Sequence, residues 1–96
     1  MTRADAISRL QQHADAIKAM GATALYLFGS TVRNEAQPAS DLDLFVDHGA
    51  GFSLLDLVGI QQLLEEELVT SVDVTTRGSL HPQLKADIEQ SAIRVF

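Results

Sequence analysis

The 96-residue sequence contains no cysteine, no tryptophan and only two prolines. Without cysteine the chain can form no disulfide, no thiolate metal site and no cysteine nucleophile. No apolar run approaches the roughly 20 residues that a membrane-spanning helix needs. The first residues, Met1 to Asp5, also lack the layout of a signal peptide. These absences make the cytoplasm the expected location and exclude a membrane span.

Basic residues are also scarce, because seven Lys and Arg stand against 13 Asp and Glu and give a net charge of −6. Nonspecific binding to nucleic acid needs clustered Lys and Arg that displace counterions, so we expect no such binding. The negative charge of a polyphosphate ligand would have to be balanced within the binding site, by backbone N–H groups, a divalent cation or a single arginine. An acidic surface is also compatible with a basic protein partner.

The apolar pattern predicts one domain over residues 1–96, with the order αβ(turn-helix)βαβα. It indicates an α/β (α+β) fold in which a small mixed sheet is flanked by helices. The expected elements are a helix over 3–20, a strand over 23–28, a helical turn over 31–35, a strand over 42–47, a helix over 54–68, a strand over 69–75 and a last helix from Pro82. The stripe expected to face the core in the 54–68 helix is Leu54, Leu57, Val58, Ile60, Leu64 and Leu68.

The most informative stretch is 24–47, where Asp41-Leu42-Asp43 leads into the second strand. Because side chains alternate along a strand, Asp41 and Asp43 are expected on one side, about 7 Å apart. Two neighbouring carboxylates are costly unless a cation neutralises them or one pKa rises. A hard cation such as Mg²⁺ prefers oxygen ligands of this kind.

Asp73 has the same character, since it stands between Val72 and Val74 in the third expected strand. If that strand lies beside the strand of Asp43, three carboxylates converge on one spot. Such a group can bind two divalent ions, or one ion together with a general base for an attacking hydroxyl.

Gly29 and Ser30, at the end of the first strand, form a candidate phosphate site. A glycine there allows a tight turn and a close approach to a ligand. A serine that opens a helical turn offers a hydroxyl and backbone N–H groups to a phosphate. Arg33, one turn later, can reach a phosphate or an aspartate of the site.

Each of these features also has a purely structural interpretation. Gly-Ser can be only a turn and a cap, Asp-x-Asp and Asp73 can be exposed strand positions, and Arg33 can be a surface ion-pair residue. Asp47 is interpreted as a strand-end residue, and Arg77-Gly78-Ser79 as a turn.

Taken together, Gly29-Ser30, Arg33, Ser40-Asp41, Asp43-Leu44 and Val46 follow the pattern G-S-x-x-R-(x)n-S-D-x-D-h-h-V, where h is apolar. With Val72-Asp73-Val74 downstream, this pattern resembles the minimal nucleotidyltransferases of the DNA polymerase β superfamily. The resemblance covers essentially the whole chain and implies a palm-like nucleotidyltransferase fold.

The resemblance also implies a role for each site residue. Gly29 and Ser30 would contact the triphosphate of the nucleotide, with Arg33 as a further nucleotide-binding residue. The three aspartates would be the catalytic and metal-binding residues: Asp41 and Asp43 would bind Mg²⁺, and Asp73 would complete the metal site and help to activate the acceptor hydroxyl.

The activity that the resemblance implies is the Mg²⁺-dependent transfer of a nucleoside monophosphate, AMP above all, from an NTP to an acceptor hydroxyl. Pyrophosphate is the leaving group. Many such proteins are partners of a helical HEPN-domain protein, often as the antitoxin of a toxin–antitoxin pair, and some adenylylate that partner. Since a palm this small has no fingers or thumb to cover a base or template, we expect a partner subunit or a homodimer to complete the site.

The main alternative keeps the fold without the catalysis, as a binding subunit whose acidic cleft neutralises a partner's basic site. The intact acid triad favours the enzyme. Haloacid-dehalogenase-type phosphatases are set aside because their acid pair directly follows a hydrophobic strand, whereas Asp41 follows Gln37-Pro38-Ala39-Ser40. An EF-hand loop is set aside because Phe45 stands where an oxygen ligand is needed.

Overall fold

The computed structural model describes residues 1–33 and 41–96. In chain order the elements are α1 (Arg3–Gln11), α2 (Ala14–Ala19), β1 (Ala22–Phe28), the 3₁₀ turn η1 (Gly29–Thr31), β2 (Leu42–His48), α3 (Leu54–Leu68), β3 (Val72–Thr76), the 3₁₀ turn η2 (Arg77–Ser79), α4 (Lys85–Ser91) and β4 (Ile93–Arg94). These strands form one sheet in the order β3-β2-β1-β4, in which β2 and β3 are parallel and the other pairs antiparallel. The predicted α/β (α+β) fold with a small mixed sheet is confirmed. No helix in this part of the chain is long and apolar enough to cross a membrane.

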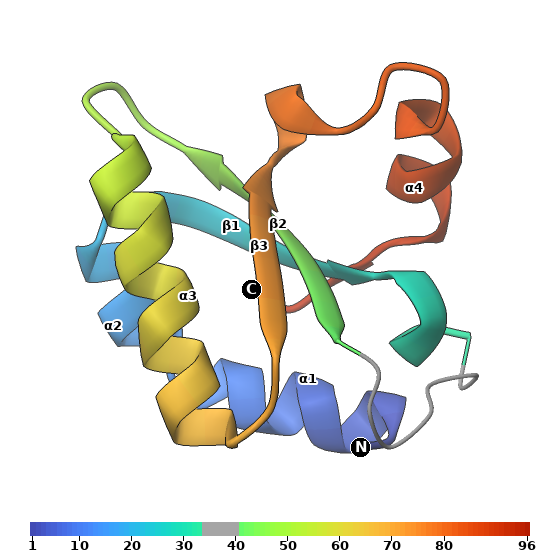
Figure 1. Ribbon diagram of the computed structural model, residues 1–96, viewed down its shortest axis with the longest axis horizontal. Helices are drawn as coiled ribbons and strands as arrows, with labels where there is room; N and C mark the ends of the chain where they lie inside the picture. Colours follow the sequence, from blue (N-terminus) through green and yellow to red (C-terminus); the bar gives the residue numbers. More distant parts are fainter. Residues whose placement is uncertain (34–40) are drawn as a thin grey trace.

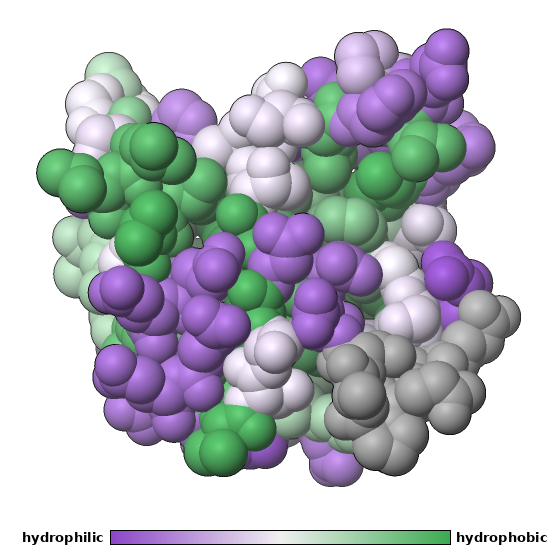
Figure 2. Space-filling view, in the orientation of Figure 1, coloured by the Kyte–Doolittle hydropathy of each residue, from purple (hydrophilic) through white to green (hydrophobic). Residues whose placement is uncertain are grey.

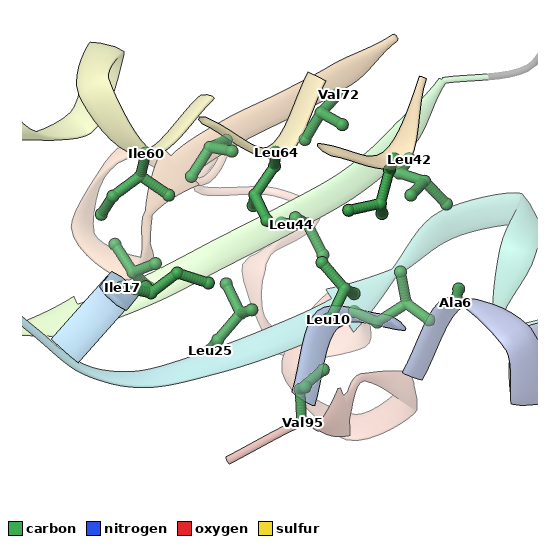
Figure 3. Packing of buried hydrophobic residues seen from close by; sticks show 14 of the residues in the cluster. Ala6, Leu10, Ile17, Leu25, Leu42, Leu44, Ile60, Leu64, Val72 and Val95 are labelled. Atoms are coloured by element: carbon green, nitrogen blue, oxygen red, sulfur yellow. The ribbon is translucent and has the colours of Figure 1, made fainter. Parts of the chain in front are cut away.

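The hydrophobic core lies between one face of the sheet and the helices α1, α2 and α3 (Figure 1). Side chains from helices and strands meet there, as Figure 3 shows, and each full burial of a leucine or isoleucine contributes about 1.5–3 kcal/mol. The other face of the sheet is turned toward α4. The fully buried residues of the core include Leu10, Ile17, Leu25, Leu27, Leu44, Ile60 and Leu64.

The single helix predicted over residues 3–20 is wrong, because the structure has two helices with a break at residues 12 and 13. His13 has φ −105° and ψ 10°, and its N–H donates to the Leu10 carbonyl, three residues back, at 3.0 Å. A three-residue step tightens the last turn of α1 and redirects the chain into α2. Periodicity cannot reveal the break, since Leu10 and Ile17 keep helical spacing across it.

Two predicted boundaries are also wrong. The strand expected from Val69 begins at Val72, because Val69 caps α3 in the left-handed conformation, with φ 53°, and is 85% exposed. The last helix begins at Lys85 and not at Pro82, because residues 82–84 form a turn in which Leu84 N–H donates to the His81 carbonyl at 2.9 Å.

The short strand β4 is absent from the sequence prediction. It pairs with β1, and the residues after it continue the contact, since Val95 N–H donates to the Leu25 carbonyl at 2.7 Å. Of the predicted turn over 31–35, Thr31 is the last residue of η1 and Val32 follows it in the helical region. Residues 34–40, which include Ser40 of the motif, lie outside the described residues.

The apolar stripe predicted for α3 is buried only in part. Ile60 and Leu64 are fully buried, but Leu54 is 74% and Val58 is 45% exposed. Leu55, which was not assigned to the stripe, is 83% exposed. In Figure 2 these apolar side chains gather on the left, over the first turns of α3. The stripe that reaches the core is therefore narrower than the sequence suggests.

Gly59 lies in the interior of α3, where a Cβ would meet no atom of the described residues within 4 Å, apart from its chain neighbours and the backbone of the helix itself. A glycine in a helix interior is less favourable than alanine by about 1 kcal/mol. We therefore expect Gly59→Ala to raise the free energy of unfolding by about 1 kcal/mol, measured by urea titration. An unchanged or lower value would show that packing within the domain requires glycine at this position.

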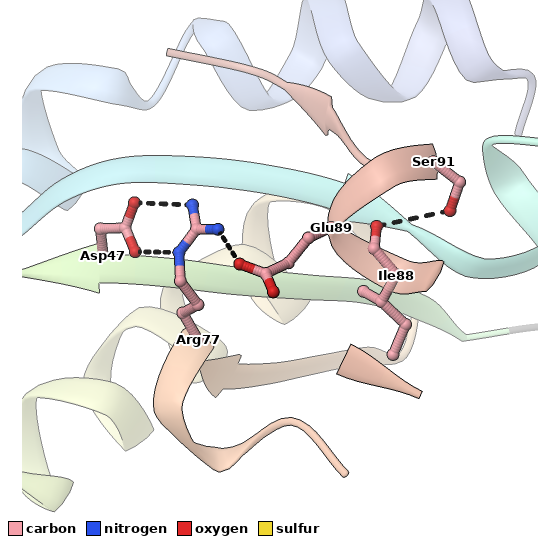
Figure 4. A network of polar contacts seen from close by, with 5 residues as sticks. All are labelled: Asp47, Arg77, Ile88, Glu89 and Ser91. Atoms are coloured by element: carbon pink, nitrogen blue, oxygen red, sulfur yellow. Dashed lines mark hydrogen bonds and ion pairs between the residues drawn. The ribbon is translucent and has the colours of Figure 1, made fainter. Parts of the chain in front are cut away.

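On the face of the sheet that is turned toward α4, which we call the second face, Arg77 connects β2 with α4 (Figure 4). Its Nε and Nη2 donate to Asp47 Oδ1 and Oδ2 at 2.7 and 3.0 Å, and its Nη1 donates to Glu89 Oε2 at 2.5 Å. The guanidinium carbon also lies 4.9 Å from the ring centroid of Tyr26 and 5.0 Å from that of Phe45. Bidentate pairing and ring contact together make Arg77 the side chain that holds α4 over this face.

Arg77→Met should lower the free energy of unfolding by roughly 1–2 kcal/mol, because Asp47 and Glu89 lose their donor at a site about one-third exposed. The hydrogen bond from Arg77 lowers the pKa of Asp47 below its ordinary 3.8. The stabilisation is therefore present above 3.8 and is lost as the pH falls through the lowered pKa. Urea titration at about pH 7 and about pH 2 should show the difference from wild type shrink at the lower pH. Arg94→Met, with a 6.0 Å contact to Tyr26, is the control and should change little.

Candidate functional site

The candidate site lies on the second face of the sheet, at the end where β1 leaves and β2 begins. Alternation along β2 buries Leu42 and Leu44 in the core and turns Asp43 to the opposite face. The cross-strand neighbours of Asp43 are Phe28 on β1 and Asp73 on β3. Adjacent strands lie about 4.8 Å apart, so Asp43 and Asp73 stand side by side, and the condition on which the sequence analysis placed them together is met.

Gly29 brings the turn after β1 against Asp43. Its φ is +80°, a left-handed conformation that favours glycine. A Cβ built at this position would overlap Oδ2 of Asp43 and lie 3.2 Å from its Cγ. The missing side chain therefore leaves the space that the Asp43 carboxylate occupies, and the two predicted halves of the site are in contact.

The turn that carries Ser30 is anchored by the two residues that follow it. Thr31 and Val32 are 2% and 8% exposed, and Arg3 Nη1 donates to the Val32 carbonyl at 3.1 Å. These contacts fix η1 to the core and to α1, and they hold the half-buried Ser30 next to β2. Arg33 follows directly, and its charge acts on the Asp43 carboxylate.

The electrostatic environment of Asp43 raises the pKa of its carboxyl above the ordinary 3.8. Burial is the largest cause, the charges of Asp73 and Asp41 add to it, and the charge of Arg33 opposes it. A half-buried carboxylate with two like-charged neighbours is a position where a proton or a cation is favourable. Oxygen donors of this kind suit Mg²⁺.

The predicted ligand group of Asp41, Asp43 and Asp73 is brought together by the backbone but not by the side chains. Asp41, just before β2, is exposed, as is Asp73. Within residues 1–33 and 41–96, no three His, Cys, Asp or Glu side chains are gathered so as to hold a metal ion. The donor chemistry fits a divalent cation, and the exposed side chains of Asp41 and Asp73 are not confined by packing.

Sequence reasoning missed the residues that complete this face. The sequence indicates only a strand end at Asp47 and a turn at Arg77. In the structure the Arg77 guanidinium donates two hydrogen bonds to the Asp47 carboxylate, two residues after Phe45 on the same face of β2. One signal was present in the sequence. Asp43, Phe45 and Asp47 recur at every second position, which places these three on one face of β2.

Comparison with known proteins identifies the family. A family profile described as the nucleotidyltransferase domain matches residues 10–95. A candidate protein adenylyltransferase of Methanocaldococcus jannaschii is 49% identical over 70 residues, which are 73% of this chain and 75% of that protein. The protein adenylyltransferase MntA of Thermococcus cleftensis is 35% identical over 74 residues, which are 77% of this chain and 71% of that protein.

Solved structures agree with the family match. A candidate minimal nucleotidyltransferase superposes with a TM-score of 0.85 at 32% identity, covering 97% of this chain and 95% of that chain. A toxin–antitoxin crystal structure with AMP-PNP shares the fold, with a TM-score of 0.72 at 18% identity, over 90% of this chain and 72% of that chain. The palm-like fold implied by the sequence motif is thus confirmed. The chain belongs to the nucleotidyltransferase domain family and is an enzyme of that class.

Proposed function

We propose that this chain transfers AMP from ATP, with Mg²⁺, to a hydroxyl group on a partner protein. The observation that carries the proposal is the contact of the Gly29–Ser30 turn with Asp43, which has Asp73 as its neighbour on the adjacent strand. Relatives named as protein adenylyltransferases support a protein acceptor. The shared fold with a toxin–antitoxin structure that contains AMP-PNP supports an adenine nucleotide.

In this proposal Gly29 and Ser30 bind the triphosphate, and Arg33 lies against a phosphate. Asp41, Asp43 and Asp73 hold one or two Mg²⁺ ions, which when bound neutralise phosphate charge and polarise the reacting phosphoryl group. The acceptor oxygen forms a bond to the α-phosphorus while the bond to the α–β bridging oxygen breaks, so that pyrophosphate leaves. Asp73 accepts the proton of the acceptor hydroxyl.

The partner in this proposal is a HEPN-domain protein, with which the chain forms a toxin–antitoxin pair in the cytoplasm. A net charge of −6 supports a basic partner surface and opposes a grip on nucleic acid. Among the described residues, Asp41 and Asp73 are exposed at the Asp43 end of the second face of the sheet. A partner, or a homodimer, would complete the site there.

Label transfer tests the proposal. The chain is incubated with Mg²⁺, the protein of the neighbouring reading frame, and ATP labelled at either the α- or the γ-phosphate. The α label should appear on the partner, with a mass gain of one AMP residue, whereas the γ label should leave in pyrophosphate. An Asp41→Asn/Asp43→Asn variant should transfer nothing. Transfer of the γ label would instead identify phosphorylation and contradict the proposal.

The non-catalytic alternative makes a different prediction for the same proteins. If the chain only binds its partner, the wild type transfers no label, and the Asp41→Asn/Asp43→Asn variant still neutralises the partner in a co-expression growth assay. That pair of results would replace the enzymatic proposal with a binding role. Transfer by the wild type alone would support the enzyme.

A further inference from the structure

The first two turns of α3 expose an apolar surface that the domain itself does not bury. We name Leu54, Leu55 and Val58, which are 74%, 83% and 45% exposed, the α3 patch. Figure 2 shows the patch as a continuous apolar area. Single exposed leucines are ordinary on protein surfaces, but adjoining apolar side chains with polar residues around them are typical of an interaction site.

Gly59 adjoins the α3 patch, one turn after Leu55. Beyond its chain neighbours and the backbone of α3 itself, no atom of the described residues lies within 4 Å of a Cβ built there, so their packing does not require glycine. A glycine on a helix surface lets a second helix approach its backbone more closely than other residues allow. Leu55, Gly59 and Gln62 recur at i, i+4 and i+7, which places them on one stripe. This stripe has the form of a helix-docking surface.

The charge of α3 indicates what kind of helix fits. The sequence of α3 contains acidic residues and no basic one, and the exposed Glu66 continues the stripe one turn after Gln62. Figure 2 shows hydrophilic residues over the C-terminal half of the helix, next to the patch. A helix with Lys or Arg at one end complements this arrangement.

A second copy of the chain fits the stripe less well. It would bring a further net charge of −6 and another helix without a basic residue. In an antiparallel pair, Glu66 of one copy would face the first turn of α3 in the other, where the carboxylate of Asp56 already caps the helix. Like charges placed opposite each other oppose association.

We propose that the α3 patch, Gly59 and Glu66 dock a helix of a partner protein that carries an apolar stripe with Lys or Arg at one end. The α3 helix covers the opposite face of the sheet from Asp43, so a docked partner leaves the candidate site open (Figure 1). The inference extends the proposed function, in which a partner protein supplies the acceptor. Docking can nevertheless be measured without any nucleotide transfer.

Defined peptides test the docking surface. The probe is a fluorescent helical peptide of leucine and lysine, compared with one in which glutamate replaces lysine. The lysine peptide should bind the wild type and shift the backbone amide signals of residues 52–66, and the glutamate peptide should not. Leu55→Ser and Val58→Ser should weaken binding about tenfold. Leu84→Ser, which removes a 53% exposed leucine from the turn before α4, is the matched control and should bind as the wild type does.

Gly59→Gln separates docking from folding. The added side chain should maintain or raise the melting temperature, because it improves helix propensity in open space, yet it should weaken peptide binding about tenfold. Asp43→Asn should bind the peptide as the wild type does, so that a failure of transfer and a failure of docking are distinguishable.

Three results would overturn the proposal. They are no binding of the lysine peptide, amide shifts that lie away from α3, and equal weakening by Leu84→Ser and Leu55→Ser. Sedimentation velocity tests whether a second copy of the chain occupies the α3 patch instead. A wild-type dimer that Leu55→Ser dissociates would assign the patch to a second copy and reject the basic helix.

Discussion

Asp43→Asn should reduce nucleotide transfer by about a thousandfold and should also make the metal-free fold more stable. In the proposed mechanism Asp43 is a ligand of Mg²⁺. Loss of one such carboxylate removes several kcal/mol of transition-state stabilisation, and about 4 kcal/mol corresponds to a thousandfold in rate. Asp43 lies between the Gly29 turn and Asp73, its neighbour on the adjacent strand. The measurement is transfer of the α label under single-turnover conditions.

The stability part of this prediction follows from the raised pKa of Asp43. Burial and the charges of Asp73 and Asp41 make the folded protein bind a proton at this carboxyl more tightly than the unfolded chain does. Ionisation therefore destabilises the fold. The effect is absent below the ordinary 3.8, grows between 3.8 and the raised pKa, and is complete above the raised pKa. In the presence of EDTA at neutral pH, Asp43→Asn should unfold at a higher urea concentration, and the gap should close at lower pH.

Asp15→Asn, at an exposed position in α2, is the control for both measurements. It should retain full transfer and should not reproduce the gain in stability. Full transfer by Asp43→Asn would remove Asp43 from the mechanism. A loss of stability in EDTA would show that hydrogen bonds hold the Asp43 carboxylate more strongly than its acidic neighbours repel it.

The part of the site that the sequence predicts depends on local rules. Alternation within β2 fixes Asp43 on the face opposite to Leu42 and Leu44, because a period of two needs only neighbouring residues. The parallel pairing of β2 with β3 follows from the helix α3 between them, since a crossover helix joins parallel strands. The sequence brings Asp73 beside Asp43 only on the condition that the two strands are neighbours, and the structure supplies that pairing with its register.

The parts that the sequence does not predict depend on contacts between distant residues. Arg77 is a turn residue by its local sequence, and its role comes from Asp47 and Glu89, which stand 30 and 12 positions away. Leu54 and Val58 fit the apolar periodicity of α3, but how much of that stripe is covered depends on how the helix lies on the sheet. The same exposure makes the α3 patch a candidate binding surface, because apolar side chains that the fold leaves exposed are available to a partner protein.

Gly29→Ala should reduce transfer about a hundredfold through the position of Asp43. Gly29 and Gly51 have φ values of +80° and +85°, so an alanine at either position meets the same left-handed conformation, at a cost of about 1–2 kcal/mol. Only at Gly29 does the new Cβ collide with another residue, and that residue is Asp43. The carboxylate must move aside, and a displacement of about 1 Å in a catalytic group can cost about a hundredfold in rate.

Gly51→Ala is therefore the matched control, since a Cβ there meets nothing within 4 Å. The two variants should lose similar stability in urea titrations, but only Gly29→Ala should lose transfer. Combining Gly29→Ala with Asp43→Asn should lose little more activity than Asp43→Asn alone, because both changes act on the same carboxylate and their effects are not additive. Additive losses would mean that Gly29 acts through the nucleotide and not through Asp43. The double variant thus distinguishes a role of Gly29 in binding the nucleotide phosphates from a role in positioning the Asp43 carboxylate.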